Sequence, residues 1–594
     1  MKSSEMRSRE RLLVLSLVTI FCFLLTTVVL LGTLSTVGPN VSKNDHHLKA
    51  KNVFYSEPET ESVIRDYSLP VHTYKQGTID AKKSYRLASL LQKMLKTHPR
   101  PADDYFGYNV TRSDEISVMR DVPDARPSEC KNRNFNYSSL PTLSIVTPFH
   151  NEALTPLLRH VHAILSRTPP QLLMEVILVD DNSTFSYLGE DLQEYFRILD
   201  SRIRIIRNKE RKGLILSRLQ GEEEARGEVV VFLDAHMEVC EGWAEPLLER
   251  IKSQPAIVVQ AHPIGINDHT IRLDTGEPLR FTGGFGWDMR YAWFPLPPYL
   301  NQFRASDWEP FPTPVLQGSC IAVRKSYFNA VGRFDPGLKI WGCEHFDLSF
   351  NVWMTGGRIE TVPCSGVGHI YKKNKYSFGS NERVHTILKN YLRVSEVWMD
   401  EYKYFVHAAI SHVRNPLPVF TEAELRSLQE RKKLRQERNS KSFAWFLKSV
   451  HTEQMVPSKE DVFFGEIKNT KSEQCWFVFE DEYVGTTVRC DLIIKEKTFS
   501  LDRYGRLKYL DRCVGYEEST FLLRIKECPS KSESETSMTW VHANNNLMTA
   551  YHSEYICASQ AKSTFPIHTG KDLVQLQTCD KNNEYQTWTF MFEF

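Results

Sequence analysis

The sequence predicts a Rossmann-like α/β domain followed by an all-β domain of three similar units, behind a single N-terminal membrane-spanning helix. Three observations support this prediction. Short aliphatic and β-branched runs alternate with helix-compatible stretches between residues 143 and 233. Six closely spaced cysteines follow residue 470. A long uncharged segment begins at Leu12.

Composition excludes several classes of protein. The chain has 594 residues, and its 74 Lys and Arg nearly balance its 73 Asp and Glu. We therefore expect no nucleic-acid partner, because such proteins usually carry an excess of basic residues on one face. Hydrophobic residues at 41% and charged residues at 25% exclude both bulk disorder and a polytopic membrane protein.

The N-terminal segment predicts an uncleaved membrane anchor. Residues 12–37 contain no charge, and residues 12–34 are long enough to cross a bilayer as a helix. Four basic residues lie in the preceding segment 1–11, which predicts a cytosolic tail. A cleavable signal peptide is the alternative, because residues 32–38 are rich in small residues. In both cases the rest of the chain enters the secretory lumen.

Residues 35–125 are predicted to be a lumenal stem. The segment 38–100 is polar, contains lysine-rich pieces and shows little sustained periodicity. Such a composition is typical of a spacer that holds a folded domain away from the membrane.

Residues 126–420 are predicted to form the α/β domain. Nearly continuous apolar runs at 143–147, 175–179, 203–206 and 229–233 indicate parallel strands buried on both faces. The stretch 155–166 between the first two runs is compatible with a helix. Ligands of such folds bind beyond the carboxyl ends of the strands, and acidic residues cluster there.

Asp234 and His236 directly follow the fourth run and form the main candidate site. Side chains two residues apart leave a strand on the same side, so the carboxylate and the imidazole can converge on one cation. An oxygen and nitrogen ligand set with open positions suits Mn²⁺, which can bridge the phosphates of a nucleotide. An ordinary turn is the alternative, because Asp45 and His47 show the same spacing in the predicted stem.

Further candidates each have a structural alternative. Asp181 follows the second run and can hydrogen-bond a nucleoside, although Asp and Asn also favour plain turns. Phe285 and Trp287 can line an acceptor cleft or pack in the core. His369 can ligate a metal or be a satisfied structural histidine.

Residues 421–460 are predicted to be a helical linker that acts as a hinge. Thr421 and Glu424 form a capping-box pattern that opens a charged helix to about Arg438. The six late cysteines then divide residues 461–594 into three units of about forty residues, each too small to bury a core alone.

Seven sequence blocks stand in one order along the chain: FHNEA (149–153), ILVDD (177–181), GLILSR (213–218), FLDAH (232–236), WGCEHFDLSF (341–350), PCSGVGHIY (363–371) and EVWMDEYK (396–403). In these blocks the chain strongly resembles the polypeptide N-acetylgalactosaminyltransferases, which start mucin-type O-glycosylation. The resemblance runs from about residue 105 to the C-terminus.

The resemblance implies a retaining glycosyltransferase with a GT-A catalytic domain and a C-terminal ricin-type β-trefoil lectin domain. It further implies a type II Golgi membrane protein, Mn²⁺ as cofactor, UDP-GalNAc as donor, and Ser or Thr of a protein or glycopeptide as acceptor. The implied route needs no enzyme nucleophile, because the departing diphosphate itself takes the acceptor proton on the same face of the sugar. Catalysis then depends on electrostatic stabilisation and positioning.

Site residues are carried over position by position. Asp234, His236 and His369 correspond to the Mn²⁺ ligands, and Asp234 and Glu344 are implied to be catalytic. Tyr376 corresponds to a residue of the lid over UDP. The remaining implied substrate-binding residues are Asp181, Arg211, Arg218, Ala235, Gly318, Trp341, His345 and Lys372.

Departures from the family pattern surround the implied sugar pocket. Cys343 and His345 stand where the family usually has Gly and Asn, and Gln317 and Ser319 stand where it has Ala and Gly. The Asp that follows each lectin Cys-Leu pair is absent from all three repeats. A catalytically weak or inactive homologue, acting as a binding or regulatory partner in the Golgi, is therefore the alternative function.

The resemblance also implies a disulfide scheme. One family bridge has lost both ends, which are Thr355 and Ser440 here. Cys240, Cys320 and Cys343 have no family partners, although Cys320 and Cys343 can alternatively bridge each other. The implied bridges are Cys130–Cys364, Cys475–Cys490, Cys513–Cys528 and Cys557–Cys579.

Overall fold

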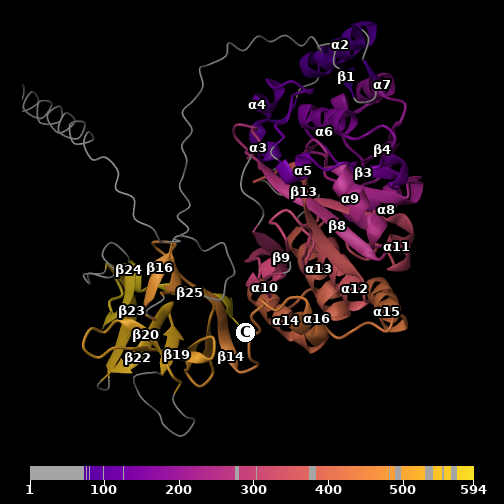
Figure 1. The fold of residues 1–594 in the computed structure, drawn as a ribbon. Helices are drawn as coiled ribbons and strands as arrows, with labels where there is room; N and C mark the ends of the chain where they lie inside the picture. Colours follow the sequence, from indigo (N-terminus) through magenta and orange to yellow (C-terminus); the bar gives the residue numbers. More distant parts are fainter. Residues whose placement is uncertain are drawn as a thin grey trace, which may run out of the picture. The chain divides into compact units, whose positions relative to one another are not determined.

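The computed structural model describes most of the chain from residue 73 to residue 593 (Figure 1). The described ranges are 73–74, 77–78, 81–97, 100–124, 126, 128–274, 280–302, 304–373, 383–479, 482–487, 497–528, 539–551, 554–562 and 572–593. The predicted tail and membrane helix, residues 1–34, lie outside them. Within these ranges, no helix combines the length and apolarity that crossing a bilayer requires.

A nine-stranded mixed sheet forms the core of the α/β domain, with the strand order β11-β13-β8-β12-β6-β3-β4-β5 and with β7 beside β13. The four predicted runs are its parallel half, whose strands are β3 (Leu143–Phe149), β4 (Leu173–Asp180), β5 (Ile203–Arg207) and β6 (Val229–Leu233). The other half was not predicted. It contains β7 (Met237–Val239), β8 (Ile257–Ile266), β11 (Phe311–Pro312), β12 (Cys320–Arg324) and β13 (Arg358–Ile370).

Helices cover both faces of this sheet (Figure 1). Adjacent residues of β3 point to opposite faces, so Ile145 joins one core cluster and Val146 joins the other. This two-sided burial explains why the strands read as continuous apolar runs. The helices are α6 (Leu154–Arg167), α7 (Glu190–Leu199), α8 (Leu214–Glu224), α9 (Ala244–Ser253), α11 (Lys325–Ala330), α12 (Glu344–Met354), α13 (Arg383–Trp398) and α14 (Lys403–Val413).

Smaller elements complete the domain. They are the pairs β1 (Thr73–Tyr74) with β2 (Gly77–Thr78) and β9 (Phe281–Phe285) with β10 (Tyr291–Pro295), the helices α5 (Ser128–Lys131) and α10 (Pro298–Gln302), and the 3₁₀ turns η1 (Tyr137–Ser139), η2 (Ser186–Leu188) and η3 (Asp400–Tyr402).

The stem predicted for residues 35–125 needs correction from residue 81 onward. Helix α2 (Ala81–Thr97) buries Leu87, Leu91 and Met94 in the core cluster that also contains α7 residues. Lys93 of α2 pairs with Asp191 of α7 at 2.7 Å. The apolar positions of α2 recur at helical spacing, a pattern that the polar composition of the segment obscured. Helices α3 (Asp103–Phe106) and α4 (Val110–Asp114) follow within the same domain.

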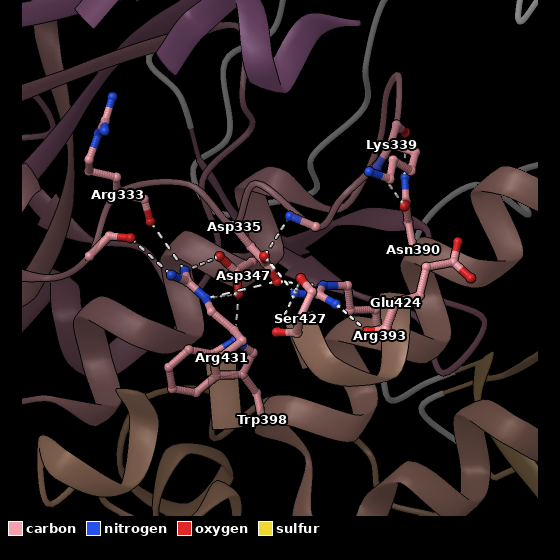
Figure 2. A network of polar contacts seen from close by, with 12 residues as sticks. Arg333, Asp335, Lys339, Asp347, Asn390, Arg393, Trp398, Glu424, Ser427 and Arg431 are labelled. Atoms are coloured by element: carbon pink, nitrogen blue, oxygen red, sulfur yellow. Dashed lines mark hydrogen bonds and ion pairs between the residues drawn. The ribbon is translucent and has the colours of Figure 1, made fainter. Parts of the chain in front are cut away.

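The predicted linker helix is α15 (Glu422–Glu437), and its Thr421–Glu424 capping box is present. Its expected role as a hinge needs correction, because α15 is fixed to the α/β domain by buried ion pairs (Figure 2). Arg431 is 5% exposed and pairs with the buried Asp347 of α12, which also accepts a 2.7 Å hydrogen bond from Trp398 Nε1. Helix α16 (Phe443–Ser449) buries further aromatic side chains.

The C-terminal region is all-β, as predicted. Trp476, Trp540 and Trp588, one from each predicted unit, are fully buried in one core cluster. Trp540 and Trp588 donate from Nε1 to the carbonyl oxygen of the residue after Cys513 and after Cys557, so two units pack alike. The strands are β14 (Asp461–Asn469), β15 (Cys475–Val478), β16 (Val484–Thr487), β17 (Phe499–Asp502), β18 (Leu507–Tyr509), β19 (Arg512–Tyr516), β20 (Leu523–Lys526), β21 (Trp540–Ala543), β22 (Asn546–Tyr551), β23 (Glu554–Lys562), β24 (Asp572–Thr578) and β25 (Trp588–Glu593), with the turn η7 (Glu584–Gln586).

The disulfides agree with the expected scheme. Cys475 is disulfide-bonded, and its expected partner Cys490 lies outside the described residues. The alternative Cys320–Cys343 bridge is wrong, because both cysteines are free and buried, as is Cys240. The bridges present are Cys130–Cys364, Cys513–Cys528 and Cys557–Cys579.

Candidate active site

Two adjoining cavities lie beyond the carboxyl ends of β3, β4 and β6, with volumes of about 560 and 510 Å³. The first extends toward Asp181 and Arg211, and the second toward Glu344 and Gln317. The residues that line both cavities are Leu214, Asp234, His236, Trp341, Lys372 and Arg383. A bound molecule with two parts can therefore span the boundary, where the Asp234 and His236 side chains lie.

Asp234, His236 and His369 converge at this boundary, with one ligand atom of each within 4.8 Å of the others. Asp234 and His236 lie in the turn between β6 and β7, so the turn rather than strand alternation brings them together. His369 comes from the end of β13, and its Nε2 lies 3.4 Å from Asp234 Oδ2. The His236 and His369 ring centroids are 4.9 Å apart.

This set fits a divalent transition-metal ion. It offers one carboxylate and two imidazoles, a mixed oxygen and nitrogen set that suits Mn²⁺. Burial and the neighbouring Lys372 lower the pKa of His236 to about 4, so its ring is neutral at neutral pH and able to ligate. His369 Nδ1 is buried and has no hydrogen-bond partner among the described residues.

Glu152 supports the cluster and was not predicted as a site residue. Its Oε2 accepts from His236 Nδ1 at 3.0 Å and from Lys372 Nζ at 2.8 Å, and its Oε1 accepts from Tyr108 Oη at 3.1 Å. Burial alone raises the pKa of Glu152, but Lys372 and His236 outweigh it and hold that pKa well below its usual range. Because Glu152 engages Nδ1 of His236, it directs Nε2 toward a cation. Its position shortly after the first predicted strand is the sequence feature that could have identified Glu152 as a site residue.

Asp181 shapes the far end of the first cavity. Its Oδ1 accepts from the Lys212 amide at 2.7 Å and from Asn208 Nδ2 at 3.1 Å, and its Oδ2 accepts from the Gly213 amide at 2.8 Å. Both carboxylate oxygens thus hold the loop that carries Arg211 into the cavity. Ala235 and residues 104–106 also line this cavity, so the supposed stem contributes directly to the site.

Arg218 organises the second cavity from a position that is 1% exposed. Its guanidinium donates to Asp234 Oδ1 at 2.9 Å, to the Gly318 carbonyl at 2.8 Å and to Glu344 Oε1 at 3.3 Å. Glu344 Oε2 and His345 Nε2 are buried with no hydrogen-bond partner in the described part of the chain. These polar atoms line a cavity in which a polyhydroxylated ligand can satisfy them.

Gln317 and Ser319, two of the unusual residues noted in the sequence, belong to a hydrogen-bond network in this cavity. Ser319 Oγ donates to Gln317 Oε1 at 3.0 Å, and Gln317 Nε2 donates to Tyr371 Oη at 2.5 Å. The Tyr371 ring lies 4.5 Å from the His369 ring, so the network reaches the candidate metal ligands.

Two other sequence candidates lie elsewhere. Phe285 and Trp287 are fully buried core residues, and Trp287 Nε1 donates to the Met455 carbonyl, so their structural interpretation is the correct one. Tyr376 lies outside the described residues.

Comparisons with known proteins agree with this architecture. A family model described as Glycosyl transferase family 2 matches residues 144–332. The chain is 33% identical over 548 residues to Polypeptide N-acetylgalactosaminyltransferase 4 of Mus musculus, covering 90% of this chain and 91% of that protein. It is 38% identical over 499 residues to Polypeptide N-acetylgalactosaminyltransferase 6 of Bos taurus, covering 82% and 77%.

A solved structure shows the same relationship. The fold is similar to that in the crystal structure of GalNAc-T7 with UDP, GalNAc and Mn²⁺, with a TM-score of 0.58 and 27% identity over 94% of this chain and 99% of that chain. Sequence identity over nearly the full length, an α/β core with an acid and two histidines beyond its strands, and this shared fold lead to one conclusion. The chain belongs to the polypeptide N-acetylgalactosaminyltransferase family of glycosyltransferases.

Proposed function

We propose that this protein transfers GalNAc from UDP-GalNAc to Ser or Thr hydroxyls of proteins in a Mn²⁺-dependent reaction. The convergence of Asp234, His236 and His369 at the boundary of two cavities carries this proposal. The first cavity takes the nucleotide beside Asp181 and Arg211. The second takes the sugar and the acceptor beside Glu344 and Gly318.

The protein's own groups position the reactants. Arg218 holds Asp234 and Glu344 in one fixed arrangement through two ion pairs. The retaining route that the family resemblance implies, in which the departing diphosphate takes the acceptor proton, is part of this proposal. When bound, Mn²⁺ supplies Lewis-acid stabilisation of charge on the departing diphosphate. Lys372 adds positive charge at the same boundary, and Trp341 packs against the donor.

A catalytically weak or inactive binding partner is the second candidate function. The Gln317–Tyr371 hydrogen bond and the bulk of Ser319, Cys343 and His345 favour it, because these residues line the cavity proposed for the sugar and differ from the family pattern. The intact metal cluster favours the enzyme.

UDP release from UDP-GalNAc with a panel of Ser and Thr peptides distinguishes the two functions. We expect UDP release that depends on Mn²⁺ and increases with the concentration of acceptor peptide. The His236→Ala variant should lose this activity, and UDP with Mn²⁺ should no longer stabilise it against thermal unfolding. Mn²⁺ and UDP binding without transfer to any peptide favours the binding partner. Unchanged Mn²⁺ binding by His236→Ala contradicts the metal assignment.

We further propose residence in the Golgi membrane as a single-pass type II protein, anchored by residues 12–34. Residues 126–420, together with the preceding helices α2, α3 and α4, form its catalytic domain. Residues 461–594 form a β-trefoil of ricin type. The equivalent packing of Trp540 and Trp588 supports a repeated fold. We infer that the trefoil does not bind GalNAc, because none of its three repeats carries the expected acid. Titration of the lumenal chain with GalNAc glycopeptides tests this, and millimolar-range binding assigned to residues 461–594 by NMR contradicts it.

A further inference from the structure

The segment 335–343 leads into α12 and has an unusual backbone. Ile340, Gly342 and Cys343 have φ values of +57°, +99° and +72°. A β-branched side chain such as that of Ile340 is sterically disfavoured in the left-handed region. Such a conformation persists when surrounding contacts hold it in place. The contacts that hold this segment therefore decide the shape of whatever it lines.

The segment lines both cavities of the candidate active site. Trp341 contributes to both, Ile340 to the first, and Gly342 and Cys343 to the second. The Ile340 carbonyl accepts from the Leu214 amide at 2.6 Å, next to the loop that Asp181 holds. A small shift of this segment would therefore move the walls of both cavities at once.

Helix α13 anchors the segment at its two ends (Figure 2). At the start, Arg393 donates from Nε and a terminal nitrogen to Asp335 at 2.7 and 2.8 Å. At the far end, Asn390 Oδ1 accepts from the Lys339 amide at 3.0 Å. Asn390 Nδ2 donates to the carbonyls of Lys339, Trp341 and Gly342 at 2.9, 3.2 and 3.3 Å.

Asn390 is chemically suited to this position. An amide side chain offers an acceptor and two donor hydrogens, so it can satisfy a backbone N–H and several carbonyls together. Asn390 is 2% exposed, so little water reaches these groups to replace it. Asn390 hydrogen-bonds to the backbone on both sides of Ile340 and so holds this strained residue in its conformation.

We infer that Asn390 is a positioning residue for the donor site, acting through the backbone of 339–342 to hold Trp341 in place. Asn390 is not among the described residues that line either cavity, so it affects the cavities only through the backbone that it binds. Its effect on donor affinity rests on the proposed function, whereas its effect on the segment does not.

Amide hydrogen exchange of the lumenal chain without substrate provides the first test. Asn390→Ala removes all the side-chain hydrogen bonds to the segment. Asn390→Asp keeps the side-chain volume but cannot donate to the three carbonyls. The matched control is Asn351→Ala, which removes another fully buried amide whose Nδ2 donates to the Val331 carbonyl at 2.6 Å. We expect Asn390→Ala to exchange at least about tenfold faster at Lys339 and Leu214, a loss of about 1.4 kcal/mol of local protection. Asn390→Asp should show the same acceleration at Leu214 alone, because its carboxylate can still accept from the Lys339 amide. The control should change neither amide.

Unchanged exchange at Leu214 in either folded Asn390 variant overturns the inference. Equal acceleration in Asn351→Ala also overturns it, because the effect then reflects general loosening. If Asn390→Ala does not fold, the volume-conserving Asn390→Asp decides the result.

Donor binding provides the second test. We expect the KM for UDP-GalNAc to rise about tenfold in Asn390→Asp with a smaller change in kcat, and the Kd for UDP in the presence of Mn²⁺ to rise in parallel. The control should leave both constants within twofold. Faster exchange with unchanged UDP affinity contradicts the positioning role. If the wild-type chain binds UDP but transfers no sugar, the proposed function fails while exchange and UDP affinity still decide the role of Asn390.

Discussion

Replacing Glu152 with Gln should weaken Mn²⁺ binding without touching a proposed ligand. Neither orientation of the amide reproduces the carboxylate: with its oxygen toward His236 and Lys372, its NH₂ faces the Ala153 amide, which also donates to this side chain. In the other orientation the NH₂ faces Lys372 Nζ. The lost negative charge also leaves the Lys372 ammonium uncompensated beside the metal cluster.

We expect Mn²⁺ affinity to fall roughly 10- to 100-fold, or about 1.4–2.8 kcal/mol, which is typical for removing a group that orients a metal-ligating histidine. Calorimetric titration of Mn²⁺ into the UDP-saturated protein measures it. The control is Glu175→Gln, another fully buried glutamate, which accepts from Ser144 at 2.9 Å and from the Arg226 amide at 2.8 Å on strand β4. Equal Mn²⁺ affinity in Glu152→Gln and wild type refutes this reasoning, as does an equal loss in both variants.

Three further predictions concern stability and covalent state. Arg431→Met should lower the free energy of unfolding by about 3–5 kcal/mol in denaturant titrations, because it leaves buried Asp347 unpaired; a loss below about 1 kcal/mol contradicts this. Burial lowers the pKa of His451 to about 3, below the value near 6.5 that it has in the unfolded chain. Between these two pH values His451 is protonated in the unfolded chain but not in the folded one, so the free energy of unfolding falls as the pH drops from 6.5 toward 3. Between pH 7 and 5, wild type should therefore lose about 2 kcal/mol more than His451→Phe, and parallel pH profiles would contradict that sign. Alkylation of the unfolded, unreduced lumenal chain should label three thiols and leave Cys130 unlabelled; the labelled thiols are Cys240, Cys320 and Cys343.

The parallel half of the sheet could be predicted because each strand carries its own signal. Strands β3 to β6 are short runs in which consecutive residues are mostly apolar, which indicates burial on both faces. Strand β6 spans the predicted residues 229–233. The capping box of α15 is equally local, since Thr421 and Glu424 lie within one turn. Local patterns did not reveal the other, mixed half of the sheet. Its strands β8, β12 and β13 are joined by pairings between residues far apart in the chain, from Ile321 with Gln260 to Ile370 with Ile266.

The sequence by itself determined the family, the Asp234, His236 and His369 set, and the three disulfide pairings that the structure describes, because these depend on residue identity at motif positions. Only the tertiary structure decided that residues 81–97 belong to the catalytic domain and that α15 is docked rather than hinged. The supporting roles of Glu152 and Asn390 also emerged only there. Each depends on contacts between residues far apart in the chain: Glu152 meets Lys372 across 220 positions, and Arg431 meets Asp347 across 84. Buried polar groups are stable only with such partners, and the chain must fold before those partners meet.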